Sequence, residues 1–131
     1  MTLTISPFLR KALLTDAVVS GAASILMVAG ASFLGPLLDL PAALLFWCGL
    51  VLVPFVALLF VLARRETTQR LLVVDVVLVN ALWVAASFAL LAMNFVAPNT
   101  LGVLFITGQA LAVALFALLQ IAGLRAATAI A

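Results

Sequence analysis

The sequence predicts an all-α membrane protein in which four transmembrane helices form an antiparallel up-down bundle. Hydrophobic residues make up 69% of the 131 residues and charged residues only 8%, against about 25% in soluble domains. None of the six basic residues falls within residues 12–63 or 71–124. Each of these stretches is long enough for two helical crossings of about 20 residues joined by a turn.

Four apolar segments supply the expected spans and make residues 1–131 a single transmembrane domain. We expect the spans at about residues 12–34, 42–63, 71–93 and 100–124. Each can cross a hydrocarbon core of about 30 Å as a helix. The connections are short and two of them contain proline, so sequential helices are expected to be antiparallel neighbours.

Local signals support the first two spans. Ser6-Pro7 is typical of an N-cap followed by proline at the first helical position, which predicts a helix that begins before the membrane edge. The apolar run that follows is longer than that of a cleaved signal peptide, so we expect an uncleaved anchor. In the second span, Trp47 fits an interfacial aromatic belt, and Pro54 predicts a static kink.

The last two spans carry further signals. Trp83 lies deep in the third span, where we expect it to pack within the bundle, and Asn99-Thr100 is a suitable cap for the fourth helix. Small residues recur every four positions, as in Ala81, Ala85 and Ala89. Such spacing favours close helix packing in lipid. Similar pairs occur at Ala110 with Ala114 and at Ala17 with Gly21.

The positions of the basic residues predict the orientation. They precede the first span, occupy the middle loop and follow the last span, at Arg10, Lys11, Arg64, Arg65, Arg70 and Arg125. The positive-inside rule then places both termini in the cytoplasm. The preference for Arg over Lys and the abundance of Ala, Leu and Val are typical of a high-GC bacterium, so we expect a bacterial inner membrane protein.

The two halves of the chain resemble each other. Residues 10–16 begin with a basic residue and end with Asp16, and residues 70–75 begin with Arg70 and end with Asp75. Each is followed by a span, a proline-containing turn and a second span. Either the bundle consists of two parallel-repeated helical hairpins, or its halves are similar only because both have the composition of membrane helices.

Two aspartates lie about four residues inside the predicted spans, at Asp16 and Asp75. Ionisable residues at this depth usually face a protein interior or an aqueous cavity. They are either a pair that binds cations or exchanges protons, or structural acids at helix N-termini. We favour the structural reading, in which they pair with Arg10, Arg64, Arg70 or Arg125.

Three amides lie deeper, at Asn80, Gln109 and Gln120. Gln120 follows Gln109 by eleven residues, which returns to nearly the same helix face, so both should point away from lipid. Buried amides commonly join membrane helices by hydrogen bonds. We favour that role over a lining for a substrate path.

The composition excludes several classes of function. With Cys48 as the only cysteine and no histidine, an intramolecular disulfide is impossible and zinc or haem sites are excluded, so we expect no cofactor. No nucleotide-binding or metalloprotease motif occurs, and the aspartates have no accompanying nucleophile, which disfavours an enzyme. Because topology explains the basic residues, nucleic acid is not an expected partner.

Residues 10–22, 80–87 and 108–113 together resemble a group of small uncharacterised four-span bacterial membrane proteins. The resemblance implies the topology and the inner membrane but no activity. We expect an interaction or accessory protein that contacts the lipid bilayer and forms a homo-oligomer or binds a membrane-protein partner. The alternative is a small oligomeric transporter or channel with Asp16, Asp75, Asn80 and Gln109 along a polar path.

Overall fold

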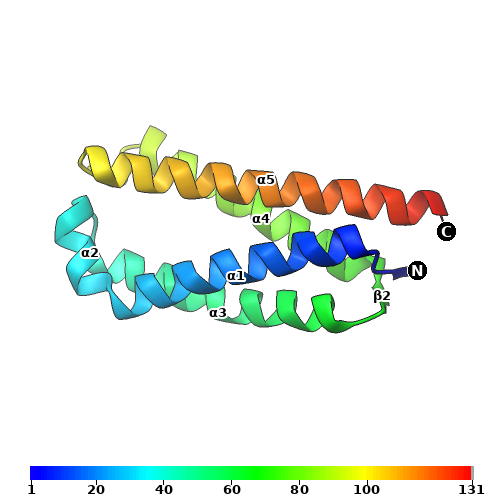
Figure 1. Ribbon diagram of the computed structural model, residues 1–131. Coiled ribbons are helices and arrows are strands. Elements are labelled where there is room, and N and C mark those ends of the chain that lie inside the picture. Colours follow the sequence, from blue (N-terminus) through cyan, green and yellow to red (C-terminus); the bar gives the residue numbers. More distant parts are fainter. Residues whose placement is uncertain (131) are drawn as a thin grey trace.

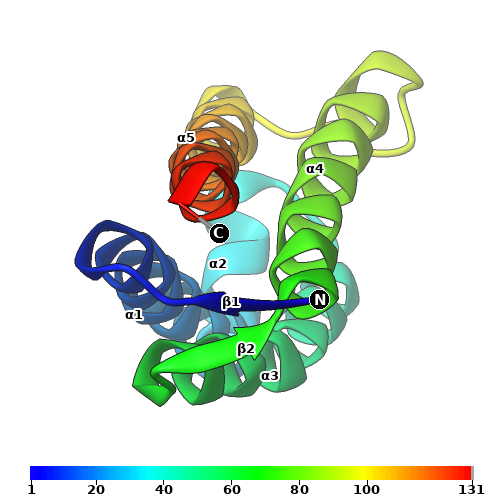
Figure 2. The same ribbon diagram turned by 90° about the vertical axis from the view of Figure 1, so that its right-hand side faces the viewer.

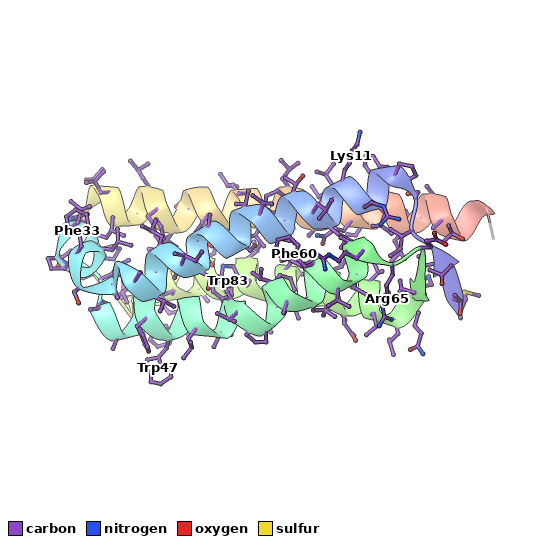
Figure 3. The ribbon with its side chains drawn as sticks, turned by 60° about the horizontal axis from the view of Figure 1, so that its bottom comes forward. Lys11, Phe33, Trp47, Phe60, Arg65 and Trp83 are labelled. Atoms are coloured by element: carbon purple, nitrogen blue, oxygen red, sulfur yellow. The ribbon has the colours of Figure 1, made fainter. Side chains whose placement is uncertain are left out.

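A computed structural model describes residues 1–130, and side chains are described for residues 1–127. It has four long apolar helices, each able to cross a membrane, which confirms the predicted all-α membrane fold. The helices are α1 (Pro7–Ala29), α2 (Ala31–Leu38), α3 (Ala42–Arg64), α4 (Arg70–Ala92) and α5 (Thr100–Ile130). Both termini lie at one end of the bundle (Figure 1). We call this the basic end, because Lys11 and Arg65 also lie toward it (Figure 3).

The helices pack unevenly around the bundle. Helix α1 packs mainly against α3 and also contacts α5, while α4 packs against α5. In contrast, the backbones of α3 and α4 do not approach closely along their length, and Figure 2 shows α4 leaning away from α3 toward its C-terminal end. The bundle is therefore closed on three sides and loose along the seam between α3 and α4.

The first long helix runs over Pro7–Ala29, so it begins before residue 12 as the Ser6-Pro7 pair predicts, and it breaks at Gly30, where a second helix follows. Ser6 caps α1 by accepting a hydrogen bond from the Leu9 N–H at 3.1 Å, which moves the helix start before residue 12. At the other end, Gly30 donates its N–H to the Leu26 carbonyl at 2.8 Å. An added Cβ at Gly30 would lie 2.6 Å from that oxygen, so only glycine fits this break.

The turn predicted at residues 35–41 is largely the short helix α2. It includes Pro36 and ends at Leu38, and the C-cap residue Asp39 has a left-handed φ of 57° and donates its N–H to the Gly35 carbonyl. Pro41 then caps the start of α3, which continues through Pro54 to Arg64. The first hairpin therefore has a helical connection at the end opposite to the basic end.

A two-stranded ribbon at the basic end has no counterpart in the sequence-based expectation. Strand β1 (Thr2–Thr4) pairs antiparallel with β2 (Thr67–Gln69), with Leu3 opposite Thr68. The Arg70 N–H also donates to the Met1 carbonyl at 2.9 Å. Leu3 and Ile5 are buried beneath the ribbon, so the N-terminal segment covers this end of the bundle.

Two apolar cores fill the bundle. The inner core lies at the basic end and contains Leu3, Ile5, Leu9, Leu13, Ala17, Leu59, Leu62, Ala63, Val73, Val76, Leu124 and Ala127. The outer core lies at the other end and contains Met27, Ala31, Leu34, Leu38, Leu40, Leu45, Leu52 and Ile106. Several side chains of the inner core have no exposed surface, whereas those of the outer core are less completely enclosed.

Candidate functional site: a buried polar layer and an apolar cavity

Asp16 lies inside the bundle with no exposed surface. Its Oδ1 atom accepts a hydrogen bond from the Ser20 hydroxyl at 2.8 Å. Its Oδ2 atom accepts one from Asn80 Nδ2 at 2.9 Å and one from Gln120 Nε2 at 2.7 Å. An ionised carboxylate only accepts hydrogen bonds, so these three donors replace many of the hydrogen bonds with water that burial removes.

Asn80 and Gln120 also bond to each other, because Asn80 Nδ2 donates to Gln120 Oε1 at 2.9 Å. Asp16, Asn80 and Gln120 therefore form a closed triangle, which we call the polar triangle. One member comes from each of α1, α4 and α5, and none is more than 3% exposed. The polar triangle joins three helices through residues at least 40 positions apart in sequence, and hydrogen bonds of this kind contribute about 0.6–2 kcal/mol each between membrane helices.

The predicted pairing with arginine is wrong for Asp16. Within residues 1–127, the side chains that bond to Asp16 are neutral, and Arg10 donates instead to the Ala63 carbonyl at the end of α3. Asp75 is exposed on α4 and takes no part in the polar triangle. The reason is geometric, since Asp16 faces α4 and α5 while Asp75 lies on the outer face of its helix.

Gln109 lies one layer farther from the basic end, in a second polar cluster with Trp83 and Ser87. Trp83 Nε1 donates to Gln109 Oε1 at 2.6 Å. Gln109 Nε2 donates to the Ser87 hydroxyl at 3.0 Å and to the Ile106 carbonyl at 2.8 Å. The Ser87 hydroxyl in turn donates to the Trp83 carbonyl at 2.7 Å. These bonds tie α4 to α5 at mid-helix.

The topology residues lie apart from these clusters, toward the basic end. Arg10, Lys11, Arg64, Arg65, Arg70 and Arg125 fall near the helix ends that meet there. Lys11 and Arg65 point outward from the bundle (Figure 3). These charges suit lipid headgroups and the adjoining water, rather than the centre of the bundle.

A cavity of about 150 Å³ occupies the outer half of the bundle, between the polar triangle and the far end. Side chains from α1, α3, α4 and α5 line it, and almost all of its wall is apolar. Four aromatic residues contribute, namely Phe55, Trp83, Phe105 and Phe116. The cavity is partly open, and its lining includes residues on both sides of the seam between α3 and α4.

No family model, curated protein or solved structure matches the chain in comparisons with known proteins. The site is therefore interpreted from its own geometry. That geometry combines a closed polar triangle, a second amide cluster and an apolar cavity that borders both.

Ser20 and Ser87 belong to the polar clusters but were not candidates from the sequence. One signal was available for Ser20, because it follows Asp16 by four residues and so lies on the same helix face. Ser87 has the same spacing from Trp83. In an apolar span, a small hydroxyl one turn away from an acid or an indole indicates a shared polar environment.

Proposed function

We propose that the chain is an accessory protein of the bacterial inner membrane that acts by assembling with a second copy of itself, with both termini in the cytoplasm. The orientation rests on the basic residues, which lie at the end of the bundle that carries both termini. The positive-inside rule assigns that end to the cytoplasm.

The use of the intramembrane polar groups carries this proposal. Asp16, Asn80, Gln109 and Gln120 bond to side chains of the same bundle, so they stabilise the fold. One face of α4 remains uncovered, and its exposed residues include Ala81 and Ala85 beside Leu78 and Leu82. Small residues flanked by leucines allow two helices to approach closely in lipid.

Transport through the bundle has less support. A carboxylate-coupled path would need both aspartates along it, and Asp75 is exposed on the outside. Between the polar triangle and the basic end, the inner core places fully buried Leu13, Leu59 and Val73. A packed apolar core of this kind has no room for a water-filled passage.

Self-assembly can be tested with Ala85→Leu, which would hold two α4 helices apart. The protein is labelled at a cysteine introduced by Thr67→Cys in a Cys48→Ser background. Donor- and acceptor-labelled copies are then mixed in liposomes at a fixed protein-to-lipid ratio. The protein with an unsubstituted α4 face should show more energy transfer than copies distributed at random in the membrane. Ala85→Leu should reduce the energy transfer to that random level.

The matched control is Ala57→Leu, which adds the same bulk at an exposed alanine of α3. It should keep the energy transfer of the unsubstituted protein. Random-level transfer with the unsubstituted face would contradict self-assembly. Transfer that survives Ala85→Leu would remove this face of α4 from the proposal.

A further inference from the structure

The cavity in the outer half of the bundle has the size of a small ligand. Its volume is about 150 Å³, and apolar protein cavities of roughly this volume stay dry and bind benzene. Phe55, Trp83, Phe105 and Phe116 present aromatic surface on several sides. A single hydrocarbon ring therefore fits the space and the chemistry of most of the wall.

The cavity is accessible from the side of the bundle. Cys48 of α3 and Val79 of α4 both line it, and the backbones of these two helices do not approach closely. Val79 is 44% exposed, which places it at the rim. At this depth the surrounding solvent is the hydrocarbon of the bilayer, so a ligand would enter from the membrane.

Asn80 places one uncommitted hydrogen-bond acceptor at the wall of this cavity. Both hydrogens of its Nδ2 atom are used, one by Asp16 and one by Gln120. Rotating the amide by half a turn would set its carbonyl oxygen against two other oxygens, so the orientation is fixed. Among the hydrogen bonds of the described residues, none uses Asn80 Oδ1, although the residue is only 3% exposed.

Apart from the Cys48 thiol, which is only a weak donor, the other polar groups of the wall have no free hydrogen to offer. The Ser20 hydroxyl donates to Asp16 and the Ser87 hydroxyl to the Trp83 carbonyl. The Trp83 indole and the Gln109 amide also use their hydrogens within their own cluster. A polar molecule in this cavity would find acceptors but no strong donor in the wall. A molecule that hydrogen-bonds to the wall must therefore bring the donor itself.

We propose that this cavity binds a neutral, membrane-dissolved molecule with a ring of phenol size whose hydroxyl donates a hydrogen bond to Oδ1 of Asn80. The ring is either a free small molecule or the head of a chain-bearing lipid, because both present the same group. The polar triangle acts as the positioning element, since Asp16 and Gln120 hold the Asn80 amide in the accepting orientation. The site goes beyond assembly through α4 and does not depend on it.

The two tryptophans allow a direct test. Trp83 lines the cavity, whereas Trp47 is 60% exposed on the outer surface of α3. In Trp47→Phe, fluorescence reports on the cavity, and in Trp83→Phe it reports on the surrounding lipid. The probe is 4-bromophenol, whose bromine quenches tryptophan, with 4-bromotoluene as the matched compound that lacks the donor.

In phosphatidylcholine liposomes, 4-bromophenol should quench Trp83 saturably and more strongly than it quenches Trp47. The membrane concentrations of the two probes are first matched by their quenching of Trp47. Half-saturation of the Trp83 signal should then require about fivefold more 4-bromotoluene than 4-bromophenol, because one neutral hydrogen bond contributes about 1 kcal/mol. Displacement by phenol would identify a free ring as sufficient, and displacement by 4-nonylphenol alone would identify a chain-bearing lipid.

A filling substitution separates the site from non-specific partitioning. Ala112→Leu adds bulk to the cavity wall on α5 and should abolish saturable quenching of Trp83, while Ala122→Leu on the exposed face of the same helix should not. Equal saturation by the two bromo compounds would overturn the role of Asn80. Two results would overturn the site. One is quenching of Trp83 that never exceeds that of Trp47, and the other is stronger quenching of Trp83 by chain-brominated lipid than by 4-bromophenol.

Discussion

At the scale of single residues, the chain places two chemically identical acids in opposite environments. Asp16 and Asp75 follow similar basic segments in sequence, yet Asp16 is fully buried and Asp75 is exposed. The difference arises from what each helix face meets. Asp16 faces two amides supplied by α4 and α5, while Asp75 faces outward. The apparent repeat in sequence therefore does not extend to the surroundings of its aspartates.

Replacing Asp16 by leucine should lower the free energy of unfolding by about 2–4 kcal/mol, because it leaves donors of Asn80 and Gln120 buried without their acceptor. Asp16→Asn should stay within about 1 kcal/mol of the unsubstituted protein. Its amide oxygen can replace Oδ2, and its nitrogen can donate to Ser20, whose hydroxyl also accepts.

Unfolding by SDS in mixed micelles, followed by circular dichroism, measures these differences. Asp75→Leu is the matched control and should change the unfolding free energy by less than about 0.5 kcal/mol, because the residue is exposed. If Asp16→Leu were as stable as this control, the polar triangle would not stabilise the bundle.

The depth of the polar residues could be predicted from the sequence, but their partners could not. Asn80 and Gln120 were expected to join helices, and the spacing of Gln109 and Gln120 placed them on one face of α5. The bond between Asn80 and Asp16 depends on how far α1 is shifted along α4. That shift is fixed by packing across three helices, and no local pattern in either helix encodes it.

At the scale of elements, the two hairpins differ in how closely their helices approach. Gly49 of α3 lies against α1, where its carbonyl accepts a hydrogen bond from the Ser24 hydroxyl at 2.7 Å. An added Cβ would lie 2.8 Å from Met27 Cβ and 3.0 Å from the Ser24 carbonyl oxygen. A glycine is required here by the contact between the helices.

Gly49→Ala should therefore lower the free energy of unfolding by about 1–3 kcal/mol, since the two helices have to move apart. Gly108→Ala is the matched control, because a Cβ at that position meets nothing within 4 Å. It should be neutral or stabilise the protein by up to about 1 kcal/mol through helix propensity. The same unfolding assay applies, and equal stability of the two variants would contradict the close contact.

The three later helices start within one residue of the predicted spans, because prolines or a charge adjoin those starts, whereas α5 continues through Arg125 to Ile130. The break between α1 and α2 was not predicted, because hydropathy does not register a helix break such as Gly30 inside an apolar run. The ribbon of β1 and β2 was missed for another reason. Three-residue strands are too short for an alternating pattern, and their pairing joins segments far apart in sequence.

At the scale of the whole molecule, the bundle has a sealed half and an open half. The inner core is tightly packed beneath the ribbon, and the polar triangle separates it from the cavity beyond. The cavity lies in the outer half, where its wall includes residues from both sides of the seam between α3 and α4. Any exchange with the surroundings within the membrane is therefore expected from the side, in the half farther from the basic end.

This arrangement predicts opposite locations for the two ends of the bundle. A fluorescent reporter that folds only in the cytoplasm should be active when fused to the C-terminus. A phosphatase that is active only after export should be active when inserted in the loop at residues 94–99 and inactive in the loop at residues 65–66. The reverse pattern would contradict the orientation derived from the basic residues.

The ribbon at the basic end has a consequence for how the protein is made. A ribosome releases β1 first, but its partner strand β2 emerges only after α1, α2 and α3 have been synthesised. Until residue 70 is available to donate to Met1, the backbone groups of β1 lack these partners, and Leu3 and Ile5 lack their cover. The N-terminal segment of the first hairpin can therefore reach its final structure only after the start of the second hairpin has been synthesised, so the folding of the two halves is coupled.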